Sequence, residues 1–377
     1  MHLRALALLA PALALAVPAR AAPVALTAPG ANTVLSQVVE IAGGRVCMAG
    51  VTVGSPREPE RGTLIVFDLA ANRVAWQKTI DPPAGSGRLA FRACQAGGGG
   101  VHAGAEAVAA AGKDGRLSAP WVYRFDDQGR LLASKEVETG SSEARVYAIE
   151  ADADGVTLAG ATGDASAAVT SNGMFVARLD SLLHGATVTR LPTGAFAHGA
   201  VARLAGNALY VGGNFLPAAQ PGGAKPDDYA MSRIVGGKYR FSARPVKRRS
   251  NGVVTAIAPA SDIVALGNDG RTTQLVAVGA DGKPREDLQV ASAFCWTSAI
   301  SADATTVYAI RTECRDPDTP AVLTAIDRRS GAEVVVSGIV GEPEYVLATG
   351  AKLVVIAKKR DGTLMLQALA KGADREE

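Results

Sequence analysis

One short pattern recurs along the sequence: an aliphatic strand ending in glycine, a polar connection, and a second strand ending near an aspartate. The first element occurs at 46–50, 156–160 and 209–213, and the second at 65–69, 174–180 and 323–327. Repetition about every 45–55 residues in an all-β pattern is typical of a β-propeller with one four-stranded sheet per blade. The spacing predicts seven blades, and because the fifth repeat is short, six or eight also remain open.

The innermost strand of each repeat is predicted from an apolar segment followed by a turn rich in glycine and aspartate. These strands are expected at 38–41, 89–94, 146–150, 200–204, 253–258, 297–300 and 345–348. The last repeat supplies only three strands, and residues 23–27 are expected to provide the fourth. Such closure removes the free sheet edges that promote aggregation. We therefore expect a single propeller domain over 22–370 and a flexible charged tail over 371–377.

The N-terminal 21 residues have the pattern of a secretory signal peptide. Arg4 precedes an apolar run over 5–17, and the small residues Ala19 and Ala21 fit a cleavage site. No later stretch reaches the ~20 apolar residues that a membrane-spanning helix requires. We therefore expect a protein exported to the periplasm or medium of a bacterium, with no membrane span. We also expect it to be a monomer.

The net charge indicates which class of partner to expect, and the cysteine content indicates which covalent links to expect. Removing Arg4 and Arg20 lowers the 39 basic residues to 37 against 36 acidic ones, so no nucleic-acid partner is expected. Four cysteines in an exported chain indicate two disulfides with three possible connectivities. We favour Cys295–Cys314, because these positions would lie at the open end of one antiparallel hairpin, and Cys47–Cys94 would then join the first blade to the start of the second. No CxxC pair supports the zinc alternative.

The longest connections all fall between the second and third strands of a repeat, at 53–62, 105–119, 164–173 and 214–229. Equivalent loops emerge on one face of a propeller, and binding usually occurs through such loops and the channel mouth. This face is therefore the expected binding face.

Two groups of residues are candidates for contact with a partner. The first is a basic cluster, which would bind an anionic headgroup, a glycan phosphate or an acidic protein, or simply be solvated. The second lies in the 214–229 loop, where aromatic side chains either contact a partner or fold back onto the blade. The basic cluster comprises Arg244, Lys247, Arg248 and Arg249, and the loop group comprises Phe215, Asp227, Asp228 and Tyr229.

Several segments resemble known propeller repeats. Residues 67–76, a strand ending in Asp68, a turn and a strand ending in Trp76, resemble the repeat of quinoprotein-type (PQQ-like) propellers. Residues 125–132 and 326–334 repeat the pattern without the tryptophan, and 156–180 are similar to bacterial secreted repeats of the SBBP or delta-60 kind. The resemblance implies the propeller fold. Quinoprotein dehydrogenases carry this tryptophan in most blades and have a Ca²⁺ site beside the quinone. Here it occurs once in that role, so no cofactor is expected.

Motifs for hydrolytic or metal chemistry are absent from the sequence. It has no HExxH or HxH pair and no G-x-S-x-G. His102, His184 and His198 fall in different repeats and are interpreted as structural or solvated. Residues 152–155, Asp-Ala-Asp-Gly, are either half of a calcium loop or a hairpin turn, and the turn is favoured because further oxygen ligands are missing. No metal site is predicted.

Two hypotheses for function follow. The first is a non-catalytic exported propeller that binds a protein or cell-envelope component through its loop-rich face. The second is an enzyme or ligand-binding propeller that uses charged residues gathered in the central channel. By position on the innermost strands, the candidates for such a channel site are Glu40, Arg92, Glu150, Arg203 and Glu344.

Overall fold

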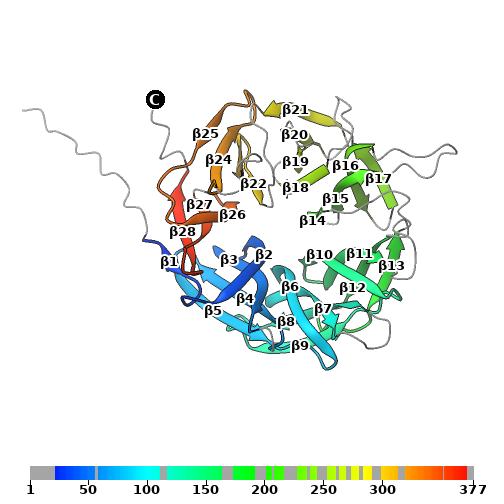
Figure 1. Cartoon of the computed structure of the whole chain (residues 1–377). Helices are drawn as coiled ribbons and strands as arrows, with labels where there is room; N and C mark the ends of the chain where they lie inside the picture. The colour runs from blue at the N-terminus through cyan, green and yellow to red at the C-terminus, as the bar shows by residue number, and fades with distance from the viewer. Residues whose placement is uncertain are drawn as a thin grey trace, which may run out of the picture.

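Antiparallel four-stranded sheets surround a common axis in the structure, a computed structural model of the 377-residue chain (Figure 1). The structure describes residues 22–55, 58–110, 117–163, 173–191, 201–205, 208–215, 227–235, 238–243, 253–259, 263–268, 273–279, 283–290, 299–312, 319–350 and 352–371. No helix occurs among these residues, and hence none that is long and apolar enough to cross a membrane.

The described residues form seven such sheets, and in six of them the strands follow in chain order from the axis to the rim. The first three contain β2 (Asn32–Ile41), β3 (Arg45–Val53), β4 (Arg61–Asp68) and β5 (Arg73–Ile80); β6 (Ser86–Gly97), β7 (Gly100–Ala109), β8 (Ser118–Phe125) and β9 (Leu131–Glu136); and β10 (Glu143–Ala151), β11 (Val156–Gly163), β12 (Gly173–Leu179) and β13 (Thr187–Leu191). The next two contain β14 (Val201–Ala205), β15 (Ala208–Phe215), β16 (Asp227–Val235) and β17 (Lys238–Ala243); and β18 (Val253–Pro259), β19 (Ile263–Asn268), β20 (Thr273–Val278) and β21 (Pro284–Val290). The last two contain β22 (Ile300–Ala302), β23 (Thr306–Arg311), β24 (Val322–Asp327) and β25 (Glu333–Val335); and β26 (Glu342–Ala348), β27 (Lys352–Lys358), β28 (Leu364–Ala370) and β1 (Val24–Ala25).

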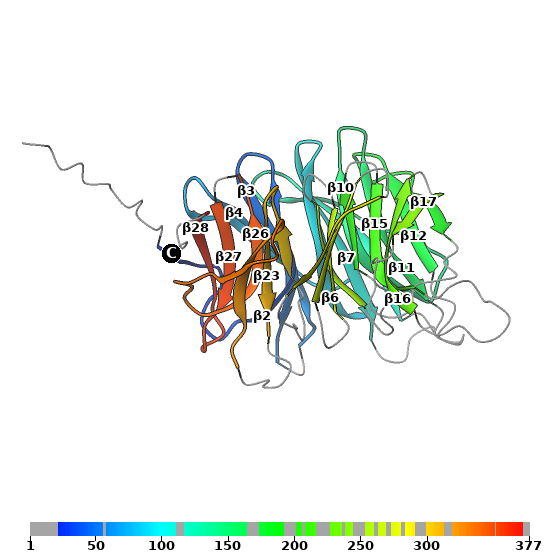
Figure 2. The same ribbon diagram turned by 90° about the horizontal axis from the view of Figure 1, so that it is seen from above.

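The innermost strands form a closed ring. Each of β2, β6, β10, β14, β18, β22 and β26 contacts the next, and β26 contacts β2. Viewed from the side, the strands run between the two faces of a disc (Figure 2). This arrangement is that of a β-propeller, as the repeat pattern predicts. Six of the predicted innermost strands overlap an observed one over most of their length. The predicted strand at 297–300 overlaps only at Ile300, where β22 begins, and 291–298 lie outside the described residues.

Burial explains why the repeat alternates between apolar and polar strands. The second and third strands of a sheet pack against neighbouring sheets on both sides, so β4 carries the continuous apolar run Leu64 to Phe67, all fully buried. The outermost strand β5 reaches the rim, and among its apolar side chains Trp76 is buried. The core is therefore distributed between adjacent sheets, as expected of a repeat protein whose stability adds up blade by blade.

Strand β1 joins the N-terminal end of the described chain to its C-terminal sheet. Val24 lies opposite Leu366 and Ala25 opposite Met365, and the backbone N–H of Leu26 donates to the carbonyl of Leu364 at 2.8 Å. The expected pairing of residues 23–27 with the last repeat is present, although the strand itself is only two residues long. Lys371, the first residue of the expected tail, lies 3.0 Å from the Asp303 carboxylate. Residues 372–377 lie outside the described residues.

Two covalent or packing links join the first sheet to the second. Cys47 of β3 and Cys94 of β6 form a buried disulfide, which confirms that part of the predicted connectivity. Cys295 and Cys314 lie outside the described residues. The Trp76 ring packs on the turn that follows β8, where a Cβ added to Gly129 would lie 2.6 Å from the indole. The single tryptophan of the quinoprotein-like repeat therefore acts as an inter-sheet packing residue.

The recurring aspartate at the end of the third strand caps a tight turn. Asp68 Oδ1 accepts hydrogen bonds from the backbone N–H groups of Ala70 and Ala71. Asp126, Asp180 and Asp327 cap the corresponding turns of later sheets in the same way. Side chains of this type stabilise turns by replacing a backbone acceptor. The Asp in this repeat is thus explained by local structure.

Candidate functional site

Five of the described innermost strands carry a β-bulge near the same position of the repeat. The pairing register shifts so that one residue stays unpaired, and these residues are Ser36, Arg92, Tyr147, Thr255 and Glu344. A bulge bends the strand and re-aims the side chain that it carries, and bulges are common beside functional sites. The bulges of β2, β6 and β10 belong to three consecutive sheets.

These three bulges line a cavity with a volume of about 760 Å³. Its walls combine charged residues with an apolar set; the lining consists of Val34, Leu35, Ser36, Val51, Val53, Glu60, Arg88, Arg92, Glu106, Val108, Leu117, Ser118, Glu143, Arg145, Val146 and Tyr147. The volume lies within the range of about 300–1,000 Å³ typical of ligand sites. We call this space the bulge cavity.

The bulge cavity opens on the face that the sequence marks as loop-bearing. Glu60 comes from the β3–β4 connection and Leu117 from the β7–β8 connection, both between second and third strands. The predicted connection at 105–119 is shorter than expected, because β7 continues to Ala109 and β8 begins at Ser118. We call the opposite face, which carries the turns 42–44, 98–99 and 152–155, the turn face.

An ion pair between Arg92 and Glu106 holds the inner wall of the bulge cavity. Arg92 Nε and Nη2 both donate to Glu106 Oε2 at 2.8 Å, and the backbone N–H of Val146 donates to Glu106 Oε1 at 2.8 Å. The Glu106 side chain is only 8% exposed. One carboxylate thus ties the second sheet to the third and fixes the guanidinium direction.

Glu106→Gln is expected to lower the free energy of unfolding by about 2 kcal/mol, less than for a fully buried pair because Arg92 keeps partial solvent access. The amide still accepts from Val146, but the charge that balances Arg92 is lost. Urea unfolding of wild type and variant measures the difference. Glu138→Gln, at an exposed position just after β9, is the control and should change the value by less than about 0.5 kcal/mol. Equal stability of wild type and E106Q would contradict the proposed role of the pair.

Two further ion pairs lie at the rim of the bulge cavity. Arg88 Nε is 2.7 Å from Glu60 Oε2, and Arg145 Nη2 is 3.0 Å from Glu143 Oε1. All four side chains are partly exposed. The backbones of Glu60 and Leu89 are hydrogen-bonded, which holds the β3–β4 connection against β6. The cavity is therefore lined by three arginines and three glutamates that form three ion pairs.

A smaller cavity of about 270 Å³ occupies the central channel. Glu40 and Glu150 line it together with Gln37, Gln95 and Ser301, and the remaining lining is mostly valine, isoleucine and alanine. Ser301 Oγ accepts from the backbone N–H of Ala348, and Gln37 Oε1 accepts from that of Cys94, so these polar groups link neighbouring sheets. These inter-sheet hydrogen bonds give Gln37 and Ser301 a structural role in this part of the channel.

The structure distributes the five channel candidates over different places. Glu40 and Glu150 share the channel cavity, while Arg92 lines the bulge cavity. Glu344 lies at the β26 bulge, where burial raises the pKa of its carboxyl and the Lys358 ammonium is 3.8 Å away. Arg203 lies in β14 opposite Tyr210, and its side chain is outside the described residues. A catalytic role for this set stays a prediction.

The contact candidates lie partly in strands and partly outside the described residues. Phe215 ends β15, and Asp227, Asp228 and Tyr229 begin β16, with Phe215 opposite Asp227. They were expected in a loop, but the hairpin ladder extends through them with one register shift. The basic cluster Arg244, Lys247, Arg248 and Arg249 lies outside the described residues.

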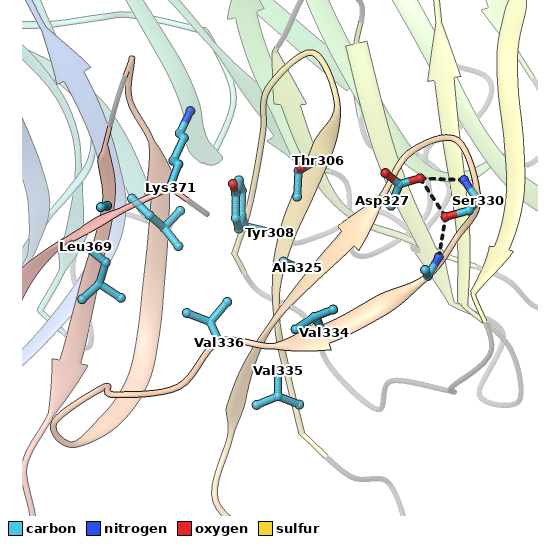
Figure 3. Close-up of a pocket in the computed structure, with 13 residues that line it drawn as sticks. Thr306, Tyr308, Ala325, Asp327, Ser330, Val334, Val335, Val336, Leu369 and Lys371 are labelled. Atoms are coloured by element: carbon cyan, nitrogen blue, oxygen red, sulfur yellow. Dashed lines mark hydrogen bonds between the residues drawn. The ribbon is translucent and has the colours of Figure 1, made fainter. Parts of the chain in front are cut away.

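A third cavity of about 290 Å³ lies between the last two sheets, between β24–β25 and β27–β28 (Figure 3). Val334, Val336, Leu369 and Tyr308 contribute to its lining, and Asp327 and Ser330 at its edge are hydrogen-bonded to each other. The sequence does not predict this pocket.

No group of three or more potential metal-ligating side chains occurs among the described residues. Asp152 Oδ1 accepts from the backbone N–H groups of Asp154 and Gly155 and from Arg178 Nη2. The segment 152–155 is therefore the hairpin turn that the sequence favoured. His184 is exposed beside Asp180, and His198 lies outside the described residues.

His102 is a buried histidine whose ring nitrogens make no hydrogen bond among the described residues. Burial, reinforced by the positive charge of Arg124, lowers its pKa from 6.5 to about 4. The unfolded chain therefore binds more protons than the folded one between these values. Stability from this group is fully present above pH 6.5 and is lost as the pH falls towards 4.

His102→Leu is expected to abolish an acid-sensitive loss of about 2.5 kcal/mol in the free energy of unfolding between pH 7 and pH 4.5. Urea unfolding at both pH values measures the loss in each variant. His184→Gln removes an exposed histidine and should retain the loss seen in the wild type. Equal acid sensitivity of H102L and wild type would contradict the assignment.

Comparison with known proteins supports the fold alone. No protein-family model matches the chain, and no curated protein is similar to it in sequence. The β-propeller domain of the Trilobed protease from Pyrococcus furiosus, reported to have an open velcro topology, is similar in structure, with a TM-score of 0.52 at 11% identity over 93% of this chain and 95% of that one. Puromycin hydrolase is similar with a TM-score of 0.55 at 15% identity, over 92% of this chain but only 52% of that one. The chain thus shares the propeller architecture, and the finer likeness to quinoprotein, SBBP or delta-60 repeats has no support from sequence matches.

Proposed function

We propose that the chain is an exported, seven-bladed, non-catalytic β-propeller that binds a protein or cell-envelope partner at its loop-bearing face. The observation that carries this proposal is the bulge cavity, which opens on that face and combines six charged side chains with apolar walls. Ligand sites are typically concave, with a few convergent polar groups on an apolar lining.

Compartment and blade count are part of the same proposal. Seven four-stranded sheets and the β1–β28 pairing support seven blades closed by the mature N-terminus. The buried Cys47–Cys94 disulfide supports an oxidising, extracellular compartment. The pattern of residues 1–21 supports cleavage of a signal peptide before the protein acts.

The test is retention of a partner by immobilised mature protein, compared between two charge reversals. Arg145→Glu alters the rim of the bulge cavity, and Arg130→Glu is the matched control on the turn face. Both arginines are exposed and each pairs with one carboxylate at 3.0 Å. We expect an envelope component to bind wild type and R130E but not R145E. Equal retention by all three proteins would contradict the binding site.

An enzymatic role is the second candidate. The observation in its favour is the structural likeness to the propeller of the Trilobed protease and to puromycin hydrolase. The test is turnover of aminoacyl and peptidyl amide substrates by the purified mature chain. Turnover that is lost on replacing both Glu40 and Glu150 with glutamine would overturn the non-catalytic proposal.

A further inference from the structure

The inner wall of the bulge cavity presents hydrogen-bond donors. Arg92 uses Nε and Nη2 on Glu106, while its Nη1 has only a 3.5 Å contact with Ser36 Oγ. The Tyr147 hydroxyl makes no hydrogen bond among the described residues, and burial raises its pKa, so it is a protonated donor at neutral pH. The guanidinium and the two hydroxyls come from the three consecutive bulges.

Glu106 balances the charge of Arg92 but accepts no hydrogen bond from Arg92 Nη1 or from the two hydroxyls. Its Oε2 accepts two bonds from Arg92 and its Oε1 accepts the backbone N–H of Val146. Both oxygens are therefore engaged, and the side chain is nearly inaccessible. One guanidinium and two hydroxyls on this wall can therefore still donate hydrogen bonds to a ligand, and a carboxylate is a suitable acceptor for them.

The rim of the same cavity presents acceptors. Glu143 Oε1 accepts both bonds from Arg145, which leaves Oε2 without a hydrogen bond among the described residues. Glu60 likewise contacts Arg88 through Oε2 alone. Carboxylates that line a cavity in this way suit an ammonium group. The side walls between the inner wall and the rim are apolar, with Val51, Val108 and Leu117 among them.

We propose that the bulge cavity binds a short peptide with free ends, its terminal carboxylate at Arg92, Ser36 and Tyr147 and its ammonium group at Glu60 and Glu143. The balanced charge of the cavity matches a zwitterion better than a polyanion or polycation, because a net-charged polymer would leave one set of charges uncompensated. The apolar walls accommodate the peptide side chains. The inference rests on the proposed function, since it assigns a ligand class to the same cavity.

Isothermal titration of the mature protein with trialanine, trialanine amide and N-acetyl-trialanine tests the proposal. Free trialanine should bind best, amidation should weaken binding at least tenfold, and acetylation should weaken it several-fold. Tyr147→Phe should lower affinity for trialanine about tenfold without moving the urea midpoint. Tyr308→Phe, in the pocket of Figure 3, is the matched control and should bind like wild type.

Three results would overturn the proposal: no binding of any of the peptides, equal binding of free and amidated trialanine, or unchanged affinity in Y147F. Failure here is separable from failure of the proposed function. If no peptide binds but R145E still loses its envelope partner, the cavity binds a different chemistry and only the peptide assignment falls. If trialanine binds but R145E keeps its partner, the partner binds elsewhere and the peptide assignment stands.

Discussion

Alanine at both Cys47 and Cys94 is expected to lower the free energy of unfolding by about 4 kcal/mol. The two residues are separated by 47 positions, and their bridge joins β3 of one sheet to β6 of the next. A cross-link across that separation removes conformational entropy from the unfolded chain. Urea unfolding of the oxidised proteins, followed by circular dichroism, measures the difference.

Reduction supplies the internal control for this experiment. Dithiothreitol should lower the stability of the wild type by at least as much as the double substitution does. If reduction lowers the free energy of unfolding of the double variant further, that loss would report the predicted Cys295–Cys314 bridge. A double variant as stable as the oxidised wild type would show that the bridge contributes nothing to the fold.

Gly160→Ala is expected to lower the free energy of unfolding by about 3 kcal/mol and to abolish ligand binding in the bulge cavity. Gly160 lies on β11 opposite Val146, next to the bulge that carries Tyr147. A Cβ at this position would lie 1.8 Å from the carbonyl oxygen of Arg145 and 2.7 Å from the Phe175 ring. The backbone of β10 must therefore move, and Tyr147 must move with it.

Gly350→Ala is the matched control, since a Cβ there meets no atom within 4 Å. Its free energy of unfolding should stay within about 0.5 kcal/mol of the wild type. Gly50 occupies the same position beside the β2 bulge, where a Cβ would lie 2.4 Å from the carbonyl oxygen of Val34. A stable G160A protein with unchanged binding would show that the bulge is not needed to position Tyr147.

Local pattern predicts much of this fold because each sheet is built from neighbouring strands. The Gly- and Asp-marked turns locate the hairpins, and their aspartates are observed as turn caps. The missing fourth strand of the last repeat predicts the β1–β28 pairing, since an unpaired edge needs a partner. The Cys47–Cys94 bridge is the pairing that remains once Cys295 and Cys314 are assigned to one hairpin, and the structure confirms it.

The bulge cavity was not predicted, because it depends on which residue of a strand is left unpaired. Ser36 and Tyr147 look like ordinary strand residues in the sequence, and a shift of one position reverses the face of every side chain after it. One available signal was Glu106, a lone charge within the apolar and small residues of β7. Which residues of different sheets come together also depends on how the sheets are arranged in the ring. A charge on an innermost strand therefore does not predict which cavity it lines: Glu40 and Glu150 line the channel cavity, whereas Arg92 lines the bulge cavity.

Hydrogen–deuterium exchange of the mature protein, with and without its retained partner, tests the central claim most directly. Binding at the bulge cavity should slow backbone exchange at the start of β6 and β10 and in the β3–β4 connection. Exchange at the turn face, including 42–44 and 152–155, should stay unchanged. If the partner slowed exchange only at the turn face or in the outer strands, and left the exchange rates of residues 86–92 and 143–147 unchanged, the account would be contradicted.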